Sequence, residues 1–590
     1  MEPDRVRASM PNDDAQPPPA SVAAVLGEVG LLAQLPVELR AQLAAEASTV
    51  SVRAGEFLFR EGDPARSVFV VRCGRLEVVS GGPAPVVIRV LKRGAVVGEL
   101  ALLGEGARSA SVYARRDSEL IELGRERFEW LIRTVPEFAV ALTRSIGRQL
   151  AVSRTAAAPA AVPRTLGVVA LDPRAPAAEV CDLLARALRE HGDVACLRRQ
   201  DEVAPDDRAA VLDRLERDHE IVLLAGGDGG SEDEWSAFCR DEADVVVAVS
   251  SGRLDAGWLK RSAALRDCEL LVVGAGVPDR VFELVAPRDT HVIGAGAQLA
   301  SAVEALARRL TGRAVGLVLS GGGARAFAHL GVLDELHAAG VRIDRLGGAS
   351  MGALVASFVA AGDDPDELHA HFKHFFVDRN PTNDYGLPAF SLIRGRKTRG
   401  MLEERFADVR IEGLPRRFYC VSCDLVGRSI VVHRTGLLRD ALYASLAIPG
   451  IYPPLRDGAG RLLVDGGVLD NLPVETMARA AEGPIIAVDV GQPRGAALPG
   501  RPRRLGLLGR ALAGTDVQLP RIGETLLRTL TLGSADTVAG ALRHADLVIA
   551  PRVEGVGMLD WKSLDRVREI GRSAAREALD AYDGAGLRLR

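Results

Sequence analysis

The chain carries a serine and an aspartate in settings that suit acyl-transfer chemistry. The segment Gly348-Ala349-Ser350-Met351-Gly352 fits the pattern G-x-S-x-G, which places a serine hydroxyl on a tight turn between a strand and a helix. Asp465 follows the apolar run Leu462–Val464 and precedes two glycines. A serine hydroxyl needs a base to take its proton. A partly desolvated aspartate within hydrogen-bond reach can serve, because desolvation raises its pKa.

A glycine loop upstream suits the negative charge that acyl transfer develops. Gly321, Gly322 and Gly323 follow the strand-like run Leu317–Ser320 at the expected start of a helix. Their consecutive N–H groups are the donors that an oxyanion hole needs. A phosphate loop is the alternative, but G-x-G-x-x-G needs a glycine where Ala326 stands, and no Walker lysine follows. Taken alone, G-x-S-x-G has many chance matches in a chain with 62 glycines and then marks a simple turn.

Together the three pieces resemble the patatin-like phospholipases, which use a Ser–Asp dyad. The resemblance runs from about Val315 to Leu579 and includes Ala444–Pro454, Ala545–Ile549 and Asp560–Lys562. It implies these functional residues: the nucleophile Ser350, the base Asp465, the oxyanion-hole glycines Gly321, Gly322 and Gly323, Arg325 as the brace of that loop, and the elbow glycines Gly348 and Gly352. Ala326 replaces the family's usual glycine, and we expect activity to survive because the donors precede it.

Other reactive side chains are interpreted as structural. His329 follows the glycine loop on an expected helix, and a packed histidine is favoured over a triad base. Cys420 and Cys423 form a lone C-x-x-C, which fits two thiols in an apolar strand better than a redox or metal pair. No metal site is predicted from three histidines that do not share one helix face, namely His369, His371 and His374.

A second constellation, near the amino end, could hold a phosphorylated ligand. Gly98 allows close backbone approach, Glu99 can accept from a ribose hydroxyl, and Arg108 offers a planar partner for phosphate oxygens. From about Leu31 to Leu150 the chain resembles the cyclic nucleotide-binding domain of the catabolite activator and of cyclic-nucleotide-dependent kinases. The resemblance implies cyclic AMP or cyclic GMP as an allosteric ligand, bound by Gly98, Glu99, Leu100, Ala101, Arg108 and Ser109. A barrel that keeps the shape without the ligand is the alternative.

The pattern of apolar residues, which predicts the elements that position these side chains, changes along the chain. Short alternating apolar runs between Val50 and Leu123 predict a small antiparallel barrel or sandwich, followed by a helix from Arg125 to about Ser153. The resemblance to the cyclic nucleotide-binding domain implies a β-barrel of jelly-roll type over 30–153. A Pro-rich leader over 1–29 and an Ala/Pro linker over 154–163 are too poor in large apolar residues to pack a core.

Continuous aliphatic runs alternate with helical stretches over 164–312 and predict a doubly wound α/β domain. The expected strands are 166–170, 221–225, 245–249 and 270–273, and the expected helices are 177–191 and 209–218. Gly226–Gly230 is interpreted as a solvated acidic turn, because Ser-Glu-Asp-Glu follows it and no lysine is present. The remaining stretch, 313–585, is expected to form the patatin-like α/β/α domain.

Length and composition exclude several classes of protein. At roughly 150 residues per domain, 590 residues fit three or four domains. A net charge of −4 gives no nucleic-acid-binding footprint. Seven dispersed cysteines argue for a reducing compartment. Neither a signal peptide nor an apolar run of about 18 residues is found. We therefore expect a cytoplasmic protein that contacts a membrane surface transiently.

The order of barrel, α/β middle and patatin-like end resembles the neuropathy target esterase family of lysophospholipases. The resemblance implies a serine hydrolase that cleaves carboxylic esters of phospholipids or lysophospholipids, needs no cofactor for catalysis, and is regulated by a cyclic nucleotide. The alternatives are a nucleotide-responsive scaffold with an inactive hydrolase domain, and a thioesterase or neutral-lipid lipase.

Overall fold

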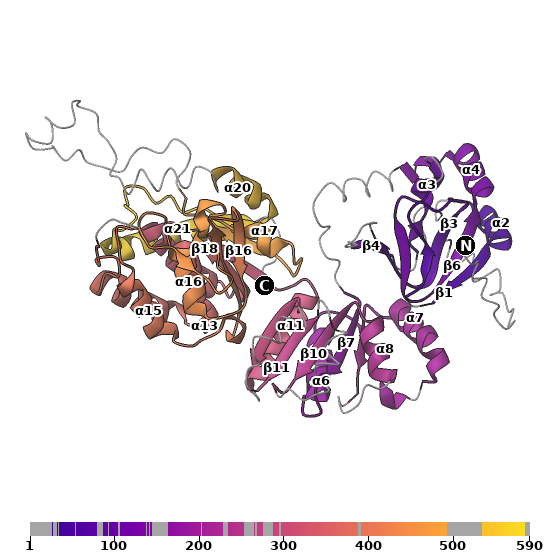
Figure 1. Ribbon diagram of the computed structural model, residues 1–590, viewed down its shortest axis with the longest axis horizontal. Coiled ribbons are helices and arrows are strands. Elements are labelled where there is room, and N and C mark those ends of the chain that lie inside the picture. The colour runs from indigo at the N-terminus through magenta and orange to yellow at the C-terminus, as the bar shows by residue number, and fades with distance from the viewer. Residues whose placement is uncertain are drawn as a thin grey trace, which may run out of the picture. The chain divides into compact units, whose positions relative to one another are not determined.

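Figure 1 shows the computed structural model of the chain. It describes Leu26, Leu32 and residues 35–143, 163–491 and 534–584, with gaps at 54, 80–86, 92–93, 104–106, 137, 141, 202, 228–233, 253–264, 266–267, 275–286, 294–296 and 387–390. The chain divides into two compact units, 1–158 with 199–222 and 159–198 with 223–590. The predicted leader (apart from Leu26), the linker up to residue 162 and most of the Gly226–Gly230 turn lie outside the described residues.

The first unit folds its alternating apolar residues into an antiparallel sheet. The strand order is β1-β6-β3-β4, with β2 also paired to β6 and β5 to β3. The strands are β1 (Ser48–Val52), β2 (Phe57–Phe59), β3 (Ser67–Val79), β4 (Val87–Leu91), β5 (Val96–Val97) and β6 (Ser111–Gly124). The helices are α2 (Val37–Glu46), α3 (Glu99–Leu103), α4 (Arg125–Thr134) and α7 (Arg208–Asp218).

The helix predicted over Arg125–Ser153 is interrupted early. Helix α4 ends at Thr134, because Val135 has an extended backbone and precedes Pro136, and proline disfavours helical backbone in the residue before it. Helical backbone resumes at Pro136, and residues 144–153 lie outside the described part of the chain.

The middle of the chain forms a six-stranded sheet of order β12-β11-β10-β7-β9-β8. The pairs β7/β10, β10/β11 and β11/β12 are parallel. Two short strands, β8 and β12, were not predicted. The elements are β7 (Thr165–Ala170), α6 (Ala177–Arg189), β8 (Val194–Arg198), β9 (Ile221–Ala225), α8 (Glu234–Glu242), β10 (Val245–Ser250), β11 (Glu269–Val273), β12 (Asp289–Ile293) and α11 (Ala297–Leu310).

The carboxyl-terminal part is built on an eight-stranded sheet of order β17-β18-β15-β14-β13-β19-β20, with β16 paired to β15. Its strands are β13 (Val315–Leu319), β14 (Ile343–Ala349), β15 (Arg417–Asp424), β16 (Ser429–His433), β17 (Leu455–Arg456), β18 (Leu462–Asp465), β19 (Ile485–Val488) and β20 (Leu547–Ile549). Its helices are α12 (Ala328–Ala338), α13 (Ser350–Ala361), α14 (Pro365–Phe372), α15 (Arg396–Phe406), α16 (Leu438–Leu446), α17 (Val474–Ala478), α20 (Ser534–Ala541) and α21 (Leu564–Gly584).

The topology of this sheet brings the candidate catalytic residues to one edge. Strands β13 and β14 are parallel neighbours, so the glycine loop after β13 and Ser350 after β14 emerge at the same edge of the sheet. Strand β18 runs antiparallel to β15, with Asp465 opposite Ser422. Because Cys420 and Val421 of β15 lie opposite Gly348 and Ala349 of β14, this register places Asp465 beside the serine turn.

The last helix, α21, packs closely against α12. A Cβ atom on Gly331 would lie 1.8 Å from the carbonyl oxygen of Arg568, and one on Gly571 would lie 2.0 Å from that of Ala328. These two glycines therefore set the distance between the helices. Within the part of the chain that the structure describes, no helix combines the length and the apolar character that crossing a membrane would need.

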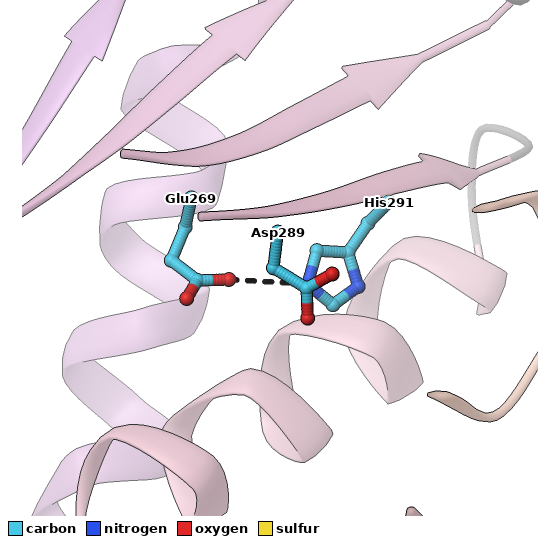
Figure 2. Close-up of side chains that lie close together, drawn as sticks. All are labelled: Glu269, Asp289 and His291. Carbon is cyan, nitrogen blue, oxygen red and sulfur yellow. Dashed lines mark hydrogen bonds and ion pairs between the residues drawn. The ribbon is translucent and has the colours of Figure 1, made fainter. Parts of the chain in front are cut away.

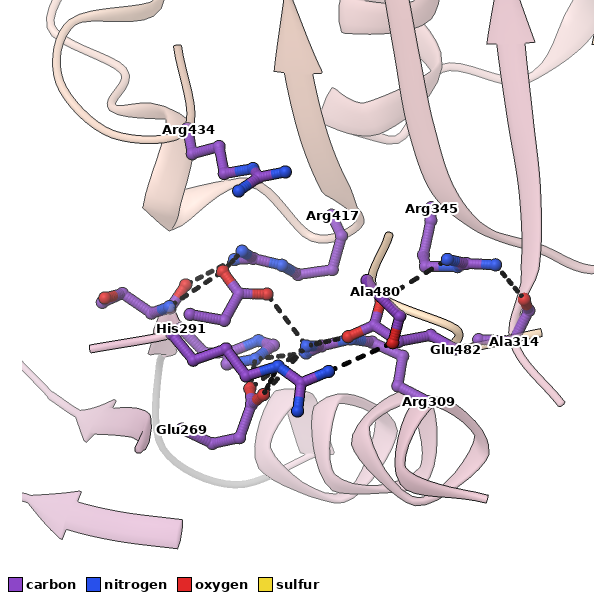
Figure 3. Close-up of polar contacts among 12 residues, drawn as sticks. Glu269, His291, Arg309, Ala314, Arg345, Arg417, Arg434, Ala480 and Glu482 are labelled. Carbon is purple, nitrogen blue, oxygen red and sulfur yellow. Dashed lines mark hydrogen bonds and ion pairs between the residues drawn. The ribbon is translucent and has the colours of Figure 1, made fainter. Parts of the chain in front are cut away.

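A buried group of charges lies where the 165–293 sheet meets the eight-stranded sheet. Figure 2 shows Glu269, Asp289 and His291 converging, with His291 Nε2 3.4 Å from Glu269. One nitrogen of Arg309, Nη2, lies 3.1 Å from Glu269, 2.9 Å from Asp289 and 2.7 Å from Glu482 (Figure 3). Glu482 precedes β19, so Arg309 joins carboxylates from both sheets.

Two arginines of the eight-stranded sheet complete this group. Arg417, at the start of β15, pairs with Asp289. Arg345, in β14, lies 3.5 Å from Glu482 and donates to the carbonyl of Gly483 at 3.0 Å. We call the group the ionic cluster; it comprises Glu269, Asp289, His291, Arg309, Arg345, Arg417 and Glu482. It lies at the amino ends of β14, β15 and β19, opposite the edge that carries Ser350.

Candidate active site

Ser350 occupies a strained turn that two glycines make room for. It begins α13 with a positive φ of 52°, which non-glycine residues adopt only where surrounding structure enforces it. A Cβ atom on Gly348 would lie 2.7 Å from the carbonyl oxygen of Leu319, and one on Gly352 would lie 2.3 Å from the same oxygen. Both glycines of the motif therefore let the turn close against the end of β13.

Asp465 lies at the end of β18 with its side chain buried. The Ser350 hydroxyl is hydrogen-bonded to its carboxylate, and the N–H of Gly467 donates to Oδ1 at 2.8 Å. Burial raises the pKa of Asp465 to about 6, although these two hydrogen bonds act in the opposite direction. A carboxylate that titrates near neutrality is far better suited to accept a proton than an ordinary aspartate.

The glycine loop has two backbone donors without a hydrogen-bond partner among the described residues. The N–H of Gly321 donates to the carbonyl of Asn471 at 3.2 Å, and the N–H of Ala324 donates to the carbonyl of Met558 at 2.7 Å. Among the described residues, no hydrogen bond takes the N–H of Gly322 or Gly323. Of the three N–H donors expected from the sequence, that of Gly321 thus already has an acceptor within the protein, whereas those of Gly322 and Gly323 do not among the described residues. The Arg325 side chain contacts the Gly322 carbonyl through Nε at 3.4 Å.

Two polar side chains that sequence reasoning missed hold these turns. The N–H of Ser350 donates to Ser445 Oγ at 3.0 Å, and Asn471 Nδ2 donates to the Gly321 carbonyl at 3.2 Å. Ser445 lies in the stretch Ala444–Pro454, which was used only as support for the family resemblance. Asn471 lies six residues after Asp465. The sequence did offer one signal for Asn471, which is a polar residue that closely follows a candidate catalytic residue.

The structure brings the proposed nucleotide residues of the first unit together. Gly98 has φ +91°, and a Cβ atom on it would lie 2.2 Å from Nη1 of Arg108. Arg108 is buried, stacks 4.0 Å from the Phe59 ring, and donates to the carbonyls of Ser67 at 2.9 Å and Gly98 at 3.2 Å. Glu99 and Ala101 are also buried, whereas Leu100 and Ser109 are exposed. These carbonyls take two of the five N–H donors of Arg108, and its buried Nε has no hydrogen-bond partner among the described residues.

Comparisons with known proteins match two regions of the chain to described families. Residues 317–478 match the family described as patatin-like phospholipase, and residues 49–135 match the cyclic nucleotide-binding domain. A Mycobacterium tuberculosis protein named "Uncharacterized NTE family protein" is 34% identical over 574 residues, covering 94% of this chain and 96% of that protein. The chain belongs to the NTE family. It is a patatin-like lipid esterase.

Longer members of the NTE family match over most of this chain. Lysophospholipase nte1 of Aspergillus fumigatus is 25% identical across 91% of the chain, which covers 42% of that protein. Among solved structures, the regulatory domain of a Toxoplasma gondii protein kinase A with cyclic AMP is 23% identical, covering 22% of this chain and 50% of that one at a TM-score of 0.21.

One histidine near the candidate site of this NTE family esterase, His329, is packed inside the protein. His329 is fully buried on α12, and its Nε2 contacts the carbonyl of Ser320 at 2.9 Å. Burial lowers the pKa of His329 to about 4, so the imidazole is neutral at pH 7. The contact ties α12 to the end of β13, which is the structural role expected from the sequence.

The ionic cluster is the one group of described residues with metal-like spacing, but its oxygens are already engaged. Ligand atoms of Glu269, Asp289 and His291 lie within 4.8 Å of one another (Figure 2). The guanidinium of Arg309 contacts both carboxylates and lies 2.8 Å from His291 Nε2. A cation there would have to displace a buried arginine. We therefore interpret the group as an ion-pair cluster.

The raised pKa of Asp465 predicts a specific pH profile. If Asp465 is the base, it must be ionised, so kcat/KM for a soluble short-chain ester should be flat above about pH 7 and fall tenfold per pH unit below about pH 6. Burial also raises the pKa of Asp470 to about 6, and Asp470→Asn is therefore the matched control, expected to keep the same acid limb. An acid limb near pH 4 in the wild type, or one that disappears in Asp470→Asn, would contradict the assignment.

Proposed function

We propose that this esterase hydrolyses carboxylic esters of lysophospholipids or phospholipids through an acyl-enzyme on Ser350. The Ser350 oxygen attacks the ester carbonyl while Asp465 takes its proton. The negative charge on the carbonyl oxygen faces the N–H groups of Gly322 and Gly323. Asp465 then returns the proton to the departing alcohol. Water then attacks the acyl-serine and gives a proton to Asp465. The bond between the acyl carbon and the Ser350 oxygen breaks, Asp465 returns the proton to that oxygen, and the fatty acid is released.

The hydrogen bond between the Ser350 hydroxyl and the buried Asp465 carboxylate carries this proposal. Two features support it: the strained turn at Ser350, and the two donors of the glycine loop that no described residue takes. The name of the Aspergillus relative, a lysophospholipase, favours a monoacyl substrate. We further propose that the enzyme is cytoplasmic and meets its lipid by transient contact with a membrane surface.

A substrate panel tests the proposal. Purified wild type is offered lysophospholipids of several head groups, diacyl phospholipids, a triacylglycerol and an acyl-CoA, and fatty-acid release is measured. We expect the highest kcat/KM on lysophospholipids. Preference for acyl-CoA or triacylglycerol would instead identify a thioesterase or a neutral-lipid lipase. A protein that releases no fatty acid and is not labelled by a fluorophosphonate would be a scaffold.

We also propose that the first unit binds cyclic AMP or cyclic GMP as an allosteric ligand. The match to the cyclic nucleotide-binding domain and the convergence of Gly98, Glu99 and Arg108 support this. The cyclic phosphate would accept from Arg108 and from backbone N–H groups after Gly98, as anions do at such turns. Glu99 would accept from the ribose hydroxyl.

Calorimetric titration of the full chain with each nucleotide checks this second proposal. Arg108→Met should weaken binding about 10- to 100-fold, because it removes a charge-assisted hydrogen bond. Arg115→Met is the matched control, since Arg115 is half exposed in the same sheet and pairs with Glu77 instead. Absence of heat with both nucleotides at ~1 mM would leave a barrel without this ligand.

A further inference from the structure

We propose that Asn471 is a positioning residue that holds the oxyanion loop, Gly321–Gly323, against the aspartate loop, Asp465–Gly467. The inference rests on the proposed function of these two loops. An ester carbonyl can react only if the nucleophile, the base and the oxyanion donors are in place at once. Ser350 is held by its own turn, whereas the two loops lie far apart in the sequence and need a link.

The link to the oxyanion loop is a reciprocal pair of hydrogen bonds. The N–H of Gly321 donates to the Asn471 carbonyl at 3.2 Å, and Asn471 Nδ2 donates to the Gly321 carbonyl at 3.2 Å. Both backbone groups of one glycine are therefore held by one residue. This fixes the orientation of the peptide that leads into Gly322 and Gly323.

The same side chain fills the space between the two loops. A Cβ atom on Gly321 would lie 2.6 Å from Asn471 Oδ1, and one on Gly467 would lie 2.8 Å from it. The N–H of Gly467 in turn holds the Asp465 carboxylate at 2.8 Å. The Asn471 carboxamide therefore contacts both glycines, and its loss would free the two loops to move relative to each other.

The chemistry of this position calls for an amide. Its nitrogen must donate to the Gly321 carbonyl, while the group stays flat and small enough to fit between two glycines. Aspartate has the same shape, but it would direct a carboxylate oxygen at that carbonyl and replace an attraction with a repulsion. Asn471→Asp thus tests the donor with little change in volume, and Asn471→Ala tests the removal of the whole group.

We expect both variants to lower kcat about 10²- to 10³-fold, the loss typical of a displaced oxyanion donor, with KM changed less than about twofold. An alkyl trifluoromethyl ketone gives a second measurement. Ser350 adds to its carbonyl carbon, the serine proton passes to Asp465, and the resulting oxyanion faces the loop. Its inhibition constant should rise by the factor by which kcat/KM falls, while the Kd of a non-hydrolysable ether lysolipid stays unchanged.

Asn383→Asp is the matched control, because Asn383 is exposed and contacts Lys397 instead; it should keep wild-type kcat. Wild-type kcat in Asn471→Asp would overturn the inference. So would a loss of activity in which the ketone still binds as tightly as to wild type. Labelling by a fluorophosphonate distinguishes failure of the proposed function from failure of this inference. A wild type that is not labelled refutes the proposed function. Equal labelling rates in wild type and Asn471→Asp refute only the role of Asn471.

Discussion

Replacement of Ser350 by alanine is expected to lower kcat for lysophospholipid hydrolysis by a factor on the order of 10⁶. The nucleophilic oxygen would be absent, and neither Asp465 nor the glycine loop can form an acyl-enzyme without it. If Ser350 and Asp465 act as a unit, as we propose, Asp465→Asn should lose nearly as much, and the double variant should lose little more. Fatty-acid release by the purified variants measures these losses, and circular dichroism checks that they fold.

The control for this experiment lies on the same helix. Ser357 is also a buried serine of α13, and its hydroxyl donates to the carbonyl of Leu354 at 2.7 Å. Ser357→Ala should keep kcat close to wild type. Hydrolysis by Ser350→Ala at the wild-type rate would remove the serine mechanism altogether. Additive losses in Asp465→Asn and Ser350→Ala would show that the two residues do not act as a dyad.

Replacement of Arg309 by methionine is expected to lower the free energy of unfolding by about 3–5 kcal/mol. Arg309 is buried, and one of its nitrogens contacts three carboxylates at 2.7–3.1 Å. Burial alone would raise the pKa of Glu269, but the charge of Arg309 holds it below its ordinary range. Without the arginine, like charges would face one another away from water. Differential scanning calorimetry should record a transition lowered by roughly 10 °C.

An exposed arginine near the cluster gives the comparison. Arg342 lies 3.5 Å from Glu304 with 57% of its side chain exposed, and Arg342→Met should cost less than about 1 kcal/mol. Adding Glu482→Gln to Arg309→Met should recover part of the loss, since it removes one of the unpaired charges. If Arg309→Met melted with the wild type, the cluster would contribute nothing to the stability of this part of the chain.

The fold could be predicted where the sequence pattern is strong. Continuous aliphatic runs identified β7, β9, β10 and β11, because a strand buried on both faces needs apolar side chains throughout. Strand β12 reads Asp289-Thr-His-Val-Ile and was missed, since it lies at the sheet edge and its polar residues serve the ionic cluster. The helix from Arg125 was predicted too long, because Pro136 disfavours helical backbone at Val135 and ends α4 there.

The candidate site shows the same division. Ser350, Asp465 and the glycine loop could be proposed from the sequence because acyl-transfer chemistry requires particular residue types in particular motifs. Which glycine N–H groups stay free could not, because Gly321 is engaged by a residue 150 positions away in the sequence. Ser445 was invisible for the same reason. Side chains that serve a distant backbone group leave no periodic signal, and only the fold reveals them.

The ionic cluster has a practical consequence for dissecting the protein. Strand β14 begins beside this cluster and ends immediately before Ser350, so one strand joins the buried charges to the proposed nucleophile. A hydrolase fragment cut at the boundary of 312 and 313 would retain Glu482, Arg345 and Arg417 but lose Arg309 and Asp289. The surface exposed by this cut would carry unpaired charges at the amino ends of β14, β15 and β19. A recombinant fragment intended for enzymology should therefore begin before β7 and keep both sheets.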